Sequence, residues 1–254
     1  MTAKNGSGDQ KDVRRYLCEN LSLADREDYK RIRTNIRFSV PESDKHMVIG
    51  VTSAQPSEGK SVTAINLAYS FAQIPDKQVL LVDCDMRRPS VSTKLGFNQI
   101  PGLSNILAGV EENHGSVKNT YIPYDSTRAF DVITCGRIPP NPSELLASDN
   151  MARCIEKMKS HYDFAFLDLP PVGAVTDAQV AADFVDGMIV VLRESYCSRP
   201  VLDDCLNQLQ YTNVKILGFV LNGSTETASK GYRYKKYNQY GRRYGYGYYG
   251  KHSP

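Results

Sequence analysis

A lysine and a serine follow a glycine at 59–61, and the surrounding residues indicate a phosphate-binding loop. An apolar run at 47–52 precedes this loop and a helical pattern at 62–73 follows it, which is the context that such a loop requires. Loop N–H groups and the next helix N-terminus bind phosphate oxygens, the lysine contacts the β- and γ-phosphates, and the serine binds Mg²⁺. The nucleotide-binding residues expected here are Ser57, Glu58, Gly59, Lys60, Ser61 and Val62.

One position departs from the usual pattern G-x-x-x-x-G-K-[ST]. Ala54 stands where that pattern has its first glycine. Alanine is the smallest substitution for glycine, but a positive φ angle at this position would be strained.

Carboxylates follow two further apolar runs, at the places where a nucleotide–metal site needs them. The run 79–83 leads into Asp83 and Asp85, and the run 164–168 ends in Asp168. Short continuous apolar runs are typical of buried parallel strands, and ligands bind at the carboxyl ends of such strands. Asp83 and Asp85 would share a face if the strand continued through both. Asp168, downstream of a phosphate-binding loop, is expected to reach Mg²⁺ directly or through water.

Tyrosines and basic residues dominate the C-terminal tail. Eight of the 16 tyrosines lie in it, together with seven of the 31 basic residues, and no acidic residue follows Glu226. With no aliphatic core residues, this segment cannot fold alone. A phenol with a pKa near 10 accepts a phosphate only with a positioned base and a metal, so site and tail together indicate transfer of phosphate to tyrosine. The expected acceptors are Tyr232, Tyr234, Tyr237, Tyr240, Tyr244, Tyr246, Tyr248 and Tyr249.

Strand and helix patterns alternate along the chain and predict an α/β fold. We expect a mostly parallel central sheet with helices on both faces, the three-layer architecture of P-loop NTPases. The expected parts are a flexible segment at 1–20, one domain at 21–225 and a flexible tail at 226–254. Asn222 ends the last predicted strand, where its amide could contact an adenine edge or could simply form a turn.

Length and composition place further limits on the protein. The 254 residues suffice for one sizeable α/β domain. The six cysteines form no C-x-x-C pair and are expected to be free thiols in a reducing cytosol. The first twenty residues are too polar for a signal peptide, and no apolar run could span a bilayer. Any membrane role is therefore expected to depend on a partner or on the tail.

These motifs resemble those of the bacterial tyrosine kinases of capsular and exopolysaccharide synthesis, in the form where the kinase is a separate cytoplasmic chain. The resemblance runs from about Asp25 to Asn222 and includes the tyrosine-rich tail. It rests on four segments, which are 54–61 (Walker A), 82–87 (Walker A′), 139–146 and 166–168 (Walker B).

The resemblance implies a role for each site residue. Lys60 would bind the phosphates, Asp83 would act as the base, Asp85 and Ser61 would bind the metal, and Asp168 would support it. It also implies ATP and Mg²⁺ as cofactors, a membrane adaptor whose cytoplasmic end activates the kinase, and a cognate tyrosine phosphatase. The implied location is the cytoplasm, with recruitment to the inner face of the membrane, and the implied process is polysaccharide polymerisation and export.

A charged helix near the N-terminus admits two interpretations. Glu27, Lys30 and Arg33 recur at a spacing of three, which is usually a solvated face. The resembled family has an E-x-x-R-x-x-R oligomerisation motif here, which favours a homo-oligomeric ring. Lys30 replaces an arginine of that motif and lacks its planar fork, which would weaken the assembly. In an oligomer the tail would be phosphorylated in trans, because it reaches a neighbour's site more easily than its own.

Two other functions compete with this interpretation. ATPase switches of the partition and division-site type (ParA/MinD-like) carry a second lysine early in the loop, where this chain has Gln55, and they lack a phenol-rich tail. A nucleic-acid-binding module would explain the tail but not the nucleotide site, so we expect no nucleic-acid partner. The signatures of eukaryotic-type kinases, H-R-D…N and D-F-G, are absent from the sequence.

Overall fold

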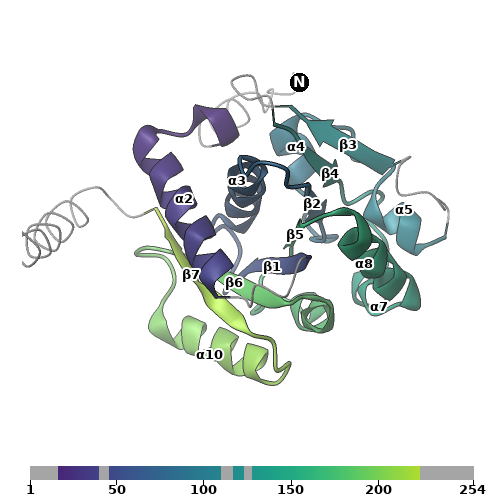
Figure 1. Ribbon diagram of the computed structural model, residues 1–254. Helices are drawn as coiled ribbons and strands as arrows, with labels where there is room; N and C mark the ends of the chain where they lie inside the picture. Colours follow the sequence, from purple (N-terminus) through teal and green to yellow (C-terminus); the bar gives the residue numbers. More distant parts are fainter. Residues whose placement is uncertain (1–16, 40–45, 110–116, 123–127, 224–254) are drawn as a thin grey trace, which may run out of the picture.

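A seven-stranded sheet lies at the centre of the molecule (Figure 1). The computed structural model describes residues 17–39, 46–109, 117–122 and 128–223. The strand order is β3-β4-β2-β5-β1-β6-β7, and every neighbouring pair is parallel except β3 with β4. The strands are β1 (Met47–Ser53), β2 (Val79–Asp83), β3 (Lys118–Tyr121), β4 (Phe130–Ile133), β5 (Phe164–Asp168), β6 (Gly187–Arg193) and β7 (Ile216–Asn222).

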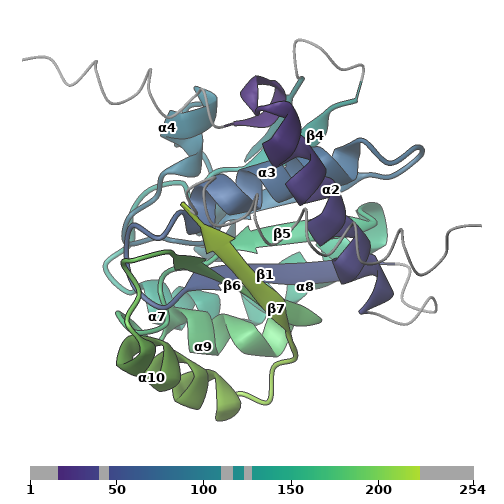
Figure 2. The same ribbon diagram turned by 90° about the vertical axis from the view of Figure 1, so that its left-hand side faces the viewer.

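Helices cover both faces of this sheet, which confirms the predicted three-layer α/β fold. Figure 2 shows α2 and α3 above β5 and β1, with α8 and α9 below them. The helices are α2 (Leu23–Phe38), α3 (Lys60–Ala72), α4 (Val91–Leu95), α5 (Leu103–Leu107), α7 (Pro142–Leu146), α8 (Asp149–His161), α9 (Asp177–Ala181) and α10 (Arg199–Gln210), with short 3₁₀ helices η1 (Cys18–Asn20) and η2 (Ala182–Phe184).

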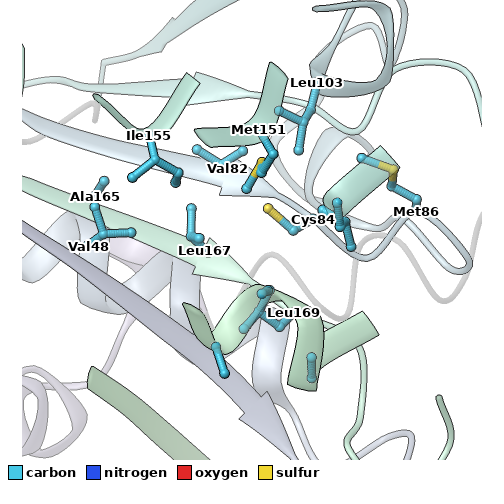
Figure 3. Close-up of a cluster of buried hydrophobic side chains, with 14 of the residues drawn as sticks. Val48, Val82, Cys84, Met86, Leu103, Met151, Ile155, Ala165, Leu167 and Leu169 are labelled. Carbon is cyan, nitrogen blue, oxygen red and sulfur yellow. The ribbon is translucent and has the colours of Figure 1, made fainter. Parts of the chain in front are cut away.

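The apolar runs of the sequence form strands that are buried on both faces. Alternate residues of β1, β2 and β5 contact opposite helical layers. In one layer, side chains such as Val82 and Leu167 meet Met151 and Ile155 of α8 (Figure 3). In the other, the Phe71 ring of α3 packs edge-on against Phe164 and Phe166, with centroids 4.6 and 5.0 Å apart. This two-sided burial explains why the runs are continuously apolar rather than alternating.

Three features differ from the sequence expectations. Strand β3 and helix α4 were not predicted; β3 is a four-residue edge strand whose residues are exposed or half-buried, so it lacks an apolar pattern. Residues 18–20, assigned to a flexible segment, form η1, which packs on α3, where the Cys18 N–H donates to Asn66 Oδ1 at 2.8 Å. Strand β2 ends at Asp83, so Asp85 lies in the turn that follows.

Two expectations from composition can be compared with the structure. All six cysteines are free thiols, as predicted. Within the ranges that the structure describes, no helix has both the length and the apolar character that a membrane span needs. The predicted acceptor tyrosines, 232–249, lie outside the described residues.

Candidate active site

The phosphate-binding loop connects β1 to α3 as the sequence predicts. Gly59, directly before Lys60, has a φ angle of +96°, and Ser57 has a φ angle of +68°. The φ angle of Ala54 is not positive, so the missing glycine introduces no backbone strain there. Lys60, Ser61 and Val62 form the first turn of α3, whose N–H groups have no partner within the helix and are suited to bind an anion.

Two residues of the predicted site hold this loop from the side of β6 and β7. The Glu58 carboxylate accepts the N–H of Gln55 at 2.9 Å and that of Arg193 at 3.4 Å. The Asn222 amide donates to the Glu58 carbonyl at 2.9 Å. Asn222 lies so close that a Cβ atom added to Gly59 would be 1.9 Å from its Nδ2. The Glu58 side chain therefore supports the loop. Any contribution of Glu58 to phosphate binding would come from its main-chain N–H group.

Lys60 lies between two of the predicted metal-binding carboxylates. Its Nζ is 2.7 Å from Asp85 Oδ2 and 3.1 Å from Asp168 Oδ1. Burial alone would lower the pKa of the Lys60 amine, but the charges of Asp168 and Asp85 outweigh burial and raise that pKa above its ordinary value. The structure thus brings together residues from the loop, the Walker A′ turn and the end of β5.

Asp83 and Asp85 point to different surroundings, because the strand stops between them. The fully buried Asp83 carboxylate accepts the N–H groups of Ser90 and Val91, both at 3.0 Å, and that of Asp85 at 3.3 Å. Burial and then the charge of Asp168 raise the pKa of Asp83 to about 7. Asp85 borders the cavity described next, whereas Asp83 lies behind it, against the start of α4.

A cavity of about 500 Å³ opens in front of the loop. One wall is formed by the loop and the start of α3, and the other by the Walker A′ turn, α4 and residues 170–175. Its lining includes Asp85 and four cationic residues, which are Lys60, Arg87, Arg88 and Lys94. No role for the last three follows from the motifs of the sequence. Arg87 and Arg88 directly follow the paired carboxylates, which is a signal for a site, whereas Lys94 lies in no recognisable pattern.

The oxygen atoms around Lys60 fit a magnesium ion. Asp168 Oδ2 is buried and makes no hydrogen bond, and Asp85 and Ser61 lie beside the same ammonium group. No cluster of three or more His, Cys, Asp or Glu side chains suited to a metal occurs in the part of the chain that the structure describes. Proteins usually bind Mg²⁺ through one or two carboxylates together with substrate phosphates and water, and Asp85 and Asp168 are carboxylates of this kind.

The charged helix near the N-terminus places its three predicted oligomerisation residues in two environments. Glu27 and Lys30 are exposed and form an ion pair of 2.6 Å. Arg33 is half-buried and donates to the Ser70 carbonyl of α3. Two of the three side chains are therefore accessible on the surface of α2, and the third packs inside the subunit.

Comparison with known proteins identifies the family. Residues 46–216 match a family model described as an AAA domain. Tyrosine-protein kinase YwqD of Bacillus subtilis is 36% identical over 208 residues, which cover 82% of this chain and 85% of the relative. The chain belongs to the bacterial tyrosine-protein kinases. Tyrosine-protein kinase CpsD of Streptococcus agalactiae is 34% identical over 216 residues, covering 85% of this chain and 89% of the relative.

Solved structures agree with this assignment. The kinase domain of the Escherichia coli tyrosine kinase ETK superposes with a TM-score of 0.76 at 32% identity, covering 82% of this chain and 79% of that one. Some relatives are longer: the chain spans only 27% of the curated Escherichia coli kinase etk. A ParA family ATPase of Chlorobium tepidum has a TM-score of 0.57 at 18% identity and shares the fold alone. The predicted family is confirmed and favoured over the partition-type alternative.

Proposed function

We propose that this chain is an ATP-dependent protein-tyrosine kinase that phosphorylates the tyrosines of its own C-terminal tail. The observation that carries the proposal is Lys60, held between Asp85 and Asp168 at the edge of a cavity in front of a phosphate-binding loop. Membership of the tyrosine-kinase family and the eight tail tyrosines support the same conclusion.

In this proposal the loop and α3 bind the ATP phosphates. The first-turn N–H groups and Lys60 contact the β- and γ-phosphates, while Ser57, Gly59 and Val62 shape the pocket. Lys60 contacts Asp85 and Asp168, the two carboxylates that we assign to the metal, so these carboxylates would contact the metal in place of Lys60, and Lys60 would contact the phosphates. Asn222 contributes by holding the loop, with a direct adenine contact as the alternative.

The metal would be held by Ser61, Asp85 and Asp168. When bound, Mg²⁺ neutralises the negative charge that develops on the transferred and leaving phosphates. We assign Asp83 the role of base, which accepts the phenol proton as the tyrosine oxygen attacks the γ-phosphorus and ADP leaves. Asp85, which borders the cavity, is the other candidate for this role.

Assembly and partners form a second part of the proposal. We assign self-association to the α2 helix through Glu27 and Lys30, with the tail of one subunit phosphorylated at the site of another. A membrane adaptor would recruit the kinase to the inner face of the membrane and activate it, and a cognate phosphatase would reverse the modification. The regulated process would be the synthesis and export of extracellular polysaccharide.

Mass spectrometry after incubation of the purified chain with ATP and Mg²⁺ tests the function. We expect phosphotyrosine within 232–249, and none in the variant Lys60→Met, which lacks the phosphate-binding charge. Because this variant also leaves Asp85 and Asp168 without their cation, its thermal melting is measured to check that it folds. Hydrolysis of ATP without any phosphotyrosine would instead support an ATPase switch. Phosphotyrosine that persists undiminished in Lys60→Met would refute the assignment of the nucleotide site.

A further inference from the structure

A buried carboxylate holds one of the arginines that line the cavity. Asp177, at the start of α9, is fully buried. Its Oδ2 accepts a hydrogen bond from Arg87 Nε at 2.9 Å, and its Oδ1 accepts one from Arg87 Nη2 at 3.1 Å. Such a two-point contact fixes the plane of the guanidinium as well as its position.

A serine completes this arrangement. The Ser143 hydroxyl donates to Asp177 Oδ1 at 2.5 Å and accepts from Arg87 Nη2 at 3.2 Å. Ser143 belongs to the segment 139–146, which takes part in the family resemblance but has no role in the function described so far. Through these contacts the segment connects α7 and α9 to the turn that carries Asp85, which is a structural role in the site.

The arrangement differs from an ordinary surface ion pair. Burying a carboxylate is costly unless it is paired and hydrogen-bonded. Among the residues that the structure describes, Asp177 meets that condition through Arg87 and Ser143. The neighbouring Arg88 also lines the cavity, yet it forms no ion pair with any residue that the structure describes. Only the first arginine of the pair is therefore locked in one orientation.

The Arg87 guanidinium, although held in place, still has N–H donors that could bind a ligand. Arginine has five N–H donors, and those used here lie on Nε and Nη2. The two N–H groups of Nη1 make no hydrogen bond within the described ranges, and the side chain lines the same cavity as Lys60. A fixed cation with free donors is what stabilises charge on the oxygens of a transferring phosphoryl group.

We propose that Arg87 contacts the phosphoryl group during its transfer to tyrosine, and that Asp177 and Ser143 are positioning residues which hold the guanidinium for this contact. The inference rests on the proposed kinase function and adds a residue to it. In the reaction the tyrosine oxygen forms a bond to the γ-phosphorus, the bond to the ADP oxygen breaks, and the phenol proton passes to the carboxylate base. Arg87 donates hydrogen bonds to the phosphoryl oxygens and changes no covalent bond.

The test compares initial rates of phosphotyrosine formation in the full chain, together with binding of ATP–Mg²⁺ by calorimetry. We expect Arg87→Ala and Arg87→Lys to lower kcat on the order of 100-fold, because a positioned donor is lost, while the Kd for ATP stays within about twofold. Asp177→Asn should lower kcat about tenfold, as loss of a supporting residue does. In the double variant Arg87→Ala/Asp177→Asn we expect no loss beyond that of Arg87→Ala, because Asp177 acts only through Arg87.

A matched control removes a cation of similar exposure from an ion pair elsewhere. Lys77 pairs with Asp163 at 2.6 Å, and its side chain is 40% exposed against 42% for Arg87, but it does not line the cavity. Lys77→Ala should leave kcat unchanged. Thermal melting of each variant separates misfolding from a loss of catalysis.

Two results would overturn the inference. One is a kcat in Arg87→Lys that equals that of the wild type, and the other is a double variant whose loss is the product of the two single losses. In both cases wild-type phosphorylation shows that the kinase function stands. A wild-type chain that binds ATP–Mg²⁺ but forms no phosphotyrosine would instead refute kinase activity in the chain by itself, and this inference with it.

Discussion

Asp85 and Asp168 bind the same ammonium group, and this shared contact sets the charge balance of the site. Lys60 compensates two carboxylates that would otherwise be buried without a cation. Asp83 is buried nearby and depends on backbone N–H groups rather than on the lysine. At the residue scale, two neighbouring aspartates therefore share a cation while the third accepts backbone N–H groups, and substitution can separate their roles.

We predict different effects for the two Walker A′ aspartates. Asp83→Asn should keep the affinity for ATP–Mg²⁺ but lose phosphate transfer by roughly 100-fold or more, because a base is needed only in the chemical step. Asp85→Asn should weaken binding that depends on Mg²⁺, because it removes a metal ligand. Calorimetry with and without Mg²⁺, combined with phosphotyrosine detection, measures both quantities. The reverse pattern would exchange the two roles and make Asp85 the base.

Asn222 allows a second prediction at this scale. Asn222→Ala removes the hydrogen bond to the Glu58 carbonyl, so the loop is held less firmly. Loss of one such bond corresponds to about a fivefold weaker affinity for ATP. If Asn222 acts by holding the loop, inorganic triphosphate should lose affinity by the same factor. A loss confined to ATP would show that the amide contacts the adenine base.

At the scale of elements, the α2 helix shows that residues of one regularly spaced pattern can lie in two environments, on the surface and against a neighbouring helix. Its N-terminus is capped by Ser22, whose hydroxyl accepts the Asp25 N–H at 3.2 Å. Residues at a spacing of three lie on nearly the same side of a helix, but each step rotates the side chain further around the axis. Glu27 and Lys30 therefore remain exposed, while Arg33 reaches α3.

We predict that the exposed pair on α2 mediates self-association. Glu27→Ala/Lys30→Ala should reduce the oligomer mass in light scattering, and Arg33 is left intact because its contact lies within the subunit. The control is Asp28→Ala/Arg31→Ala, which removes another ion pair of the same spacing on the same helix. An unchanged mass in the first variant, or a wild type that is monomeric at every concentration, would assign the helix to the solvated surface.

At the scale of the whole molecule, charge is distributed unevenly along the chain. Seven basic residues and no acidic residue lie from Lys230 onward, while the remainder has 24 basic and 28 acidic residues. Each phosphotyrosine would add about −1.5 to −2 charge. Several would make the tail acidic like the body, so repulsion would loosen an assembly in which the tail binds a neighbour.

We predict that the tail is phosphorylated in trans. When the full-length variant Lys60→Met is mixed with an active chain that ends at Thr225, the inactive chain should acquire phosphotyrosine. The phosphorylated wild type should also show a lower mass in light scattering than the unphosphorylated form. Absence of phosphotyrosine in the mixture, together with a rate per molecule that does not change on dilution, would show that the reaction occurs within one chain.

The strands of the core, the phosphate-binding loop and the family can all be predicted from the amino-acid sequence. Each of these features depends on residues that are contiguous in the sequence. The apolar run Phe164–Asp168, for example, predicts a strand that is covered by helices on both faces, and the strand is buried throughout. The loop is recognisable because its glycine, lysine and serine bind phosphate from adjacent positions. The edge strand Lys118–Tyr121 could not be predicted, because it is not fully buried and its residues show no apolar pattern.

Which charged groups come into contact depends on the folded arrangement of the chain. Lys60 and Asp168 are 108 residues apart, and Arg87 and Asp177 are 90 apart, yet each pair is in direct contact. Such contacts depend on the order of strands in the sheet, which places the ends of β1, β2 and β5 side by side. Local patterns record burial and periodicity but not strand order, so they could not show that a buried aspartate on α9 holds an arginine of the active-site cavity.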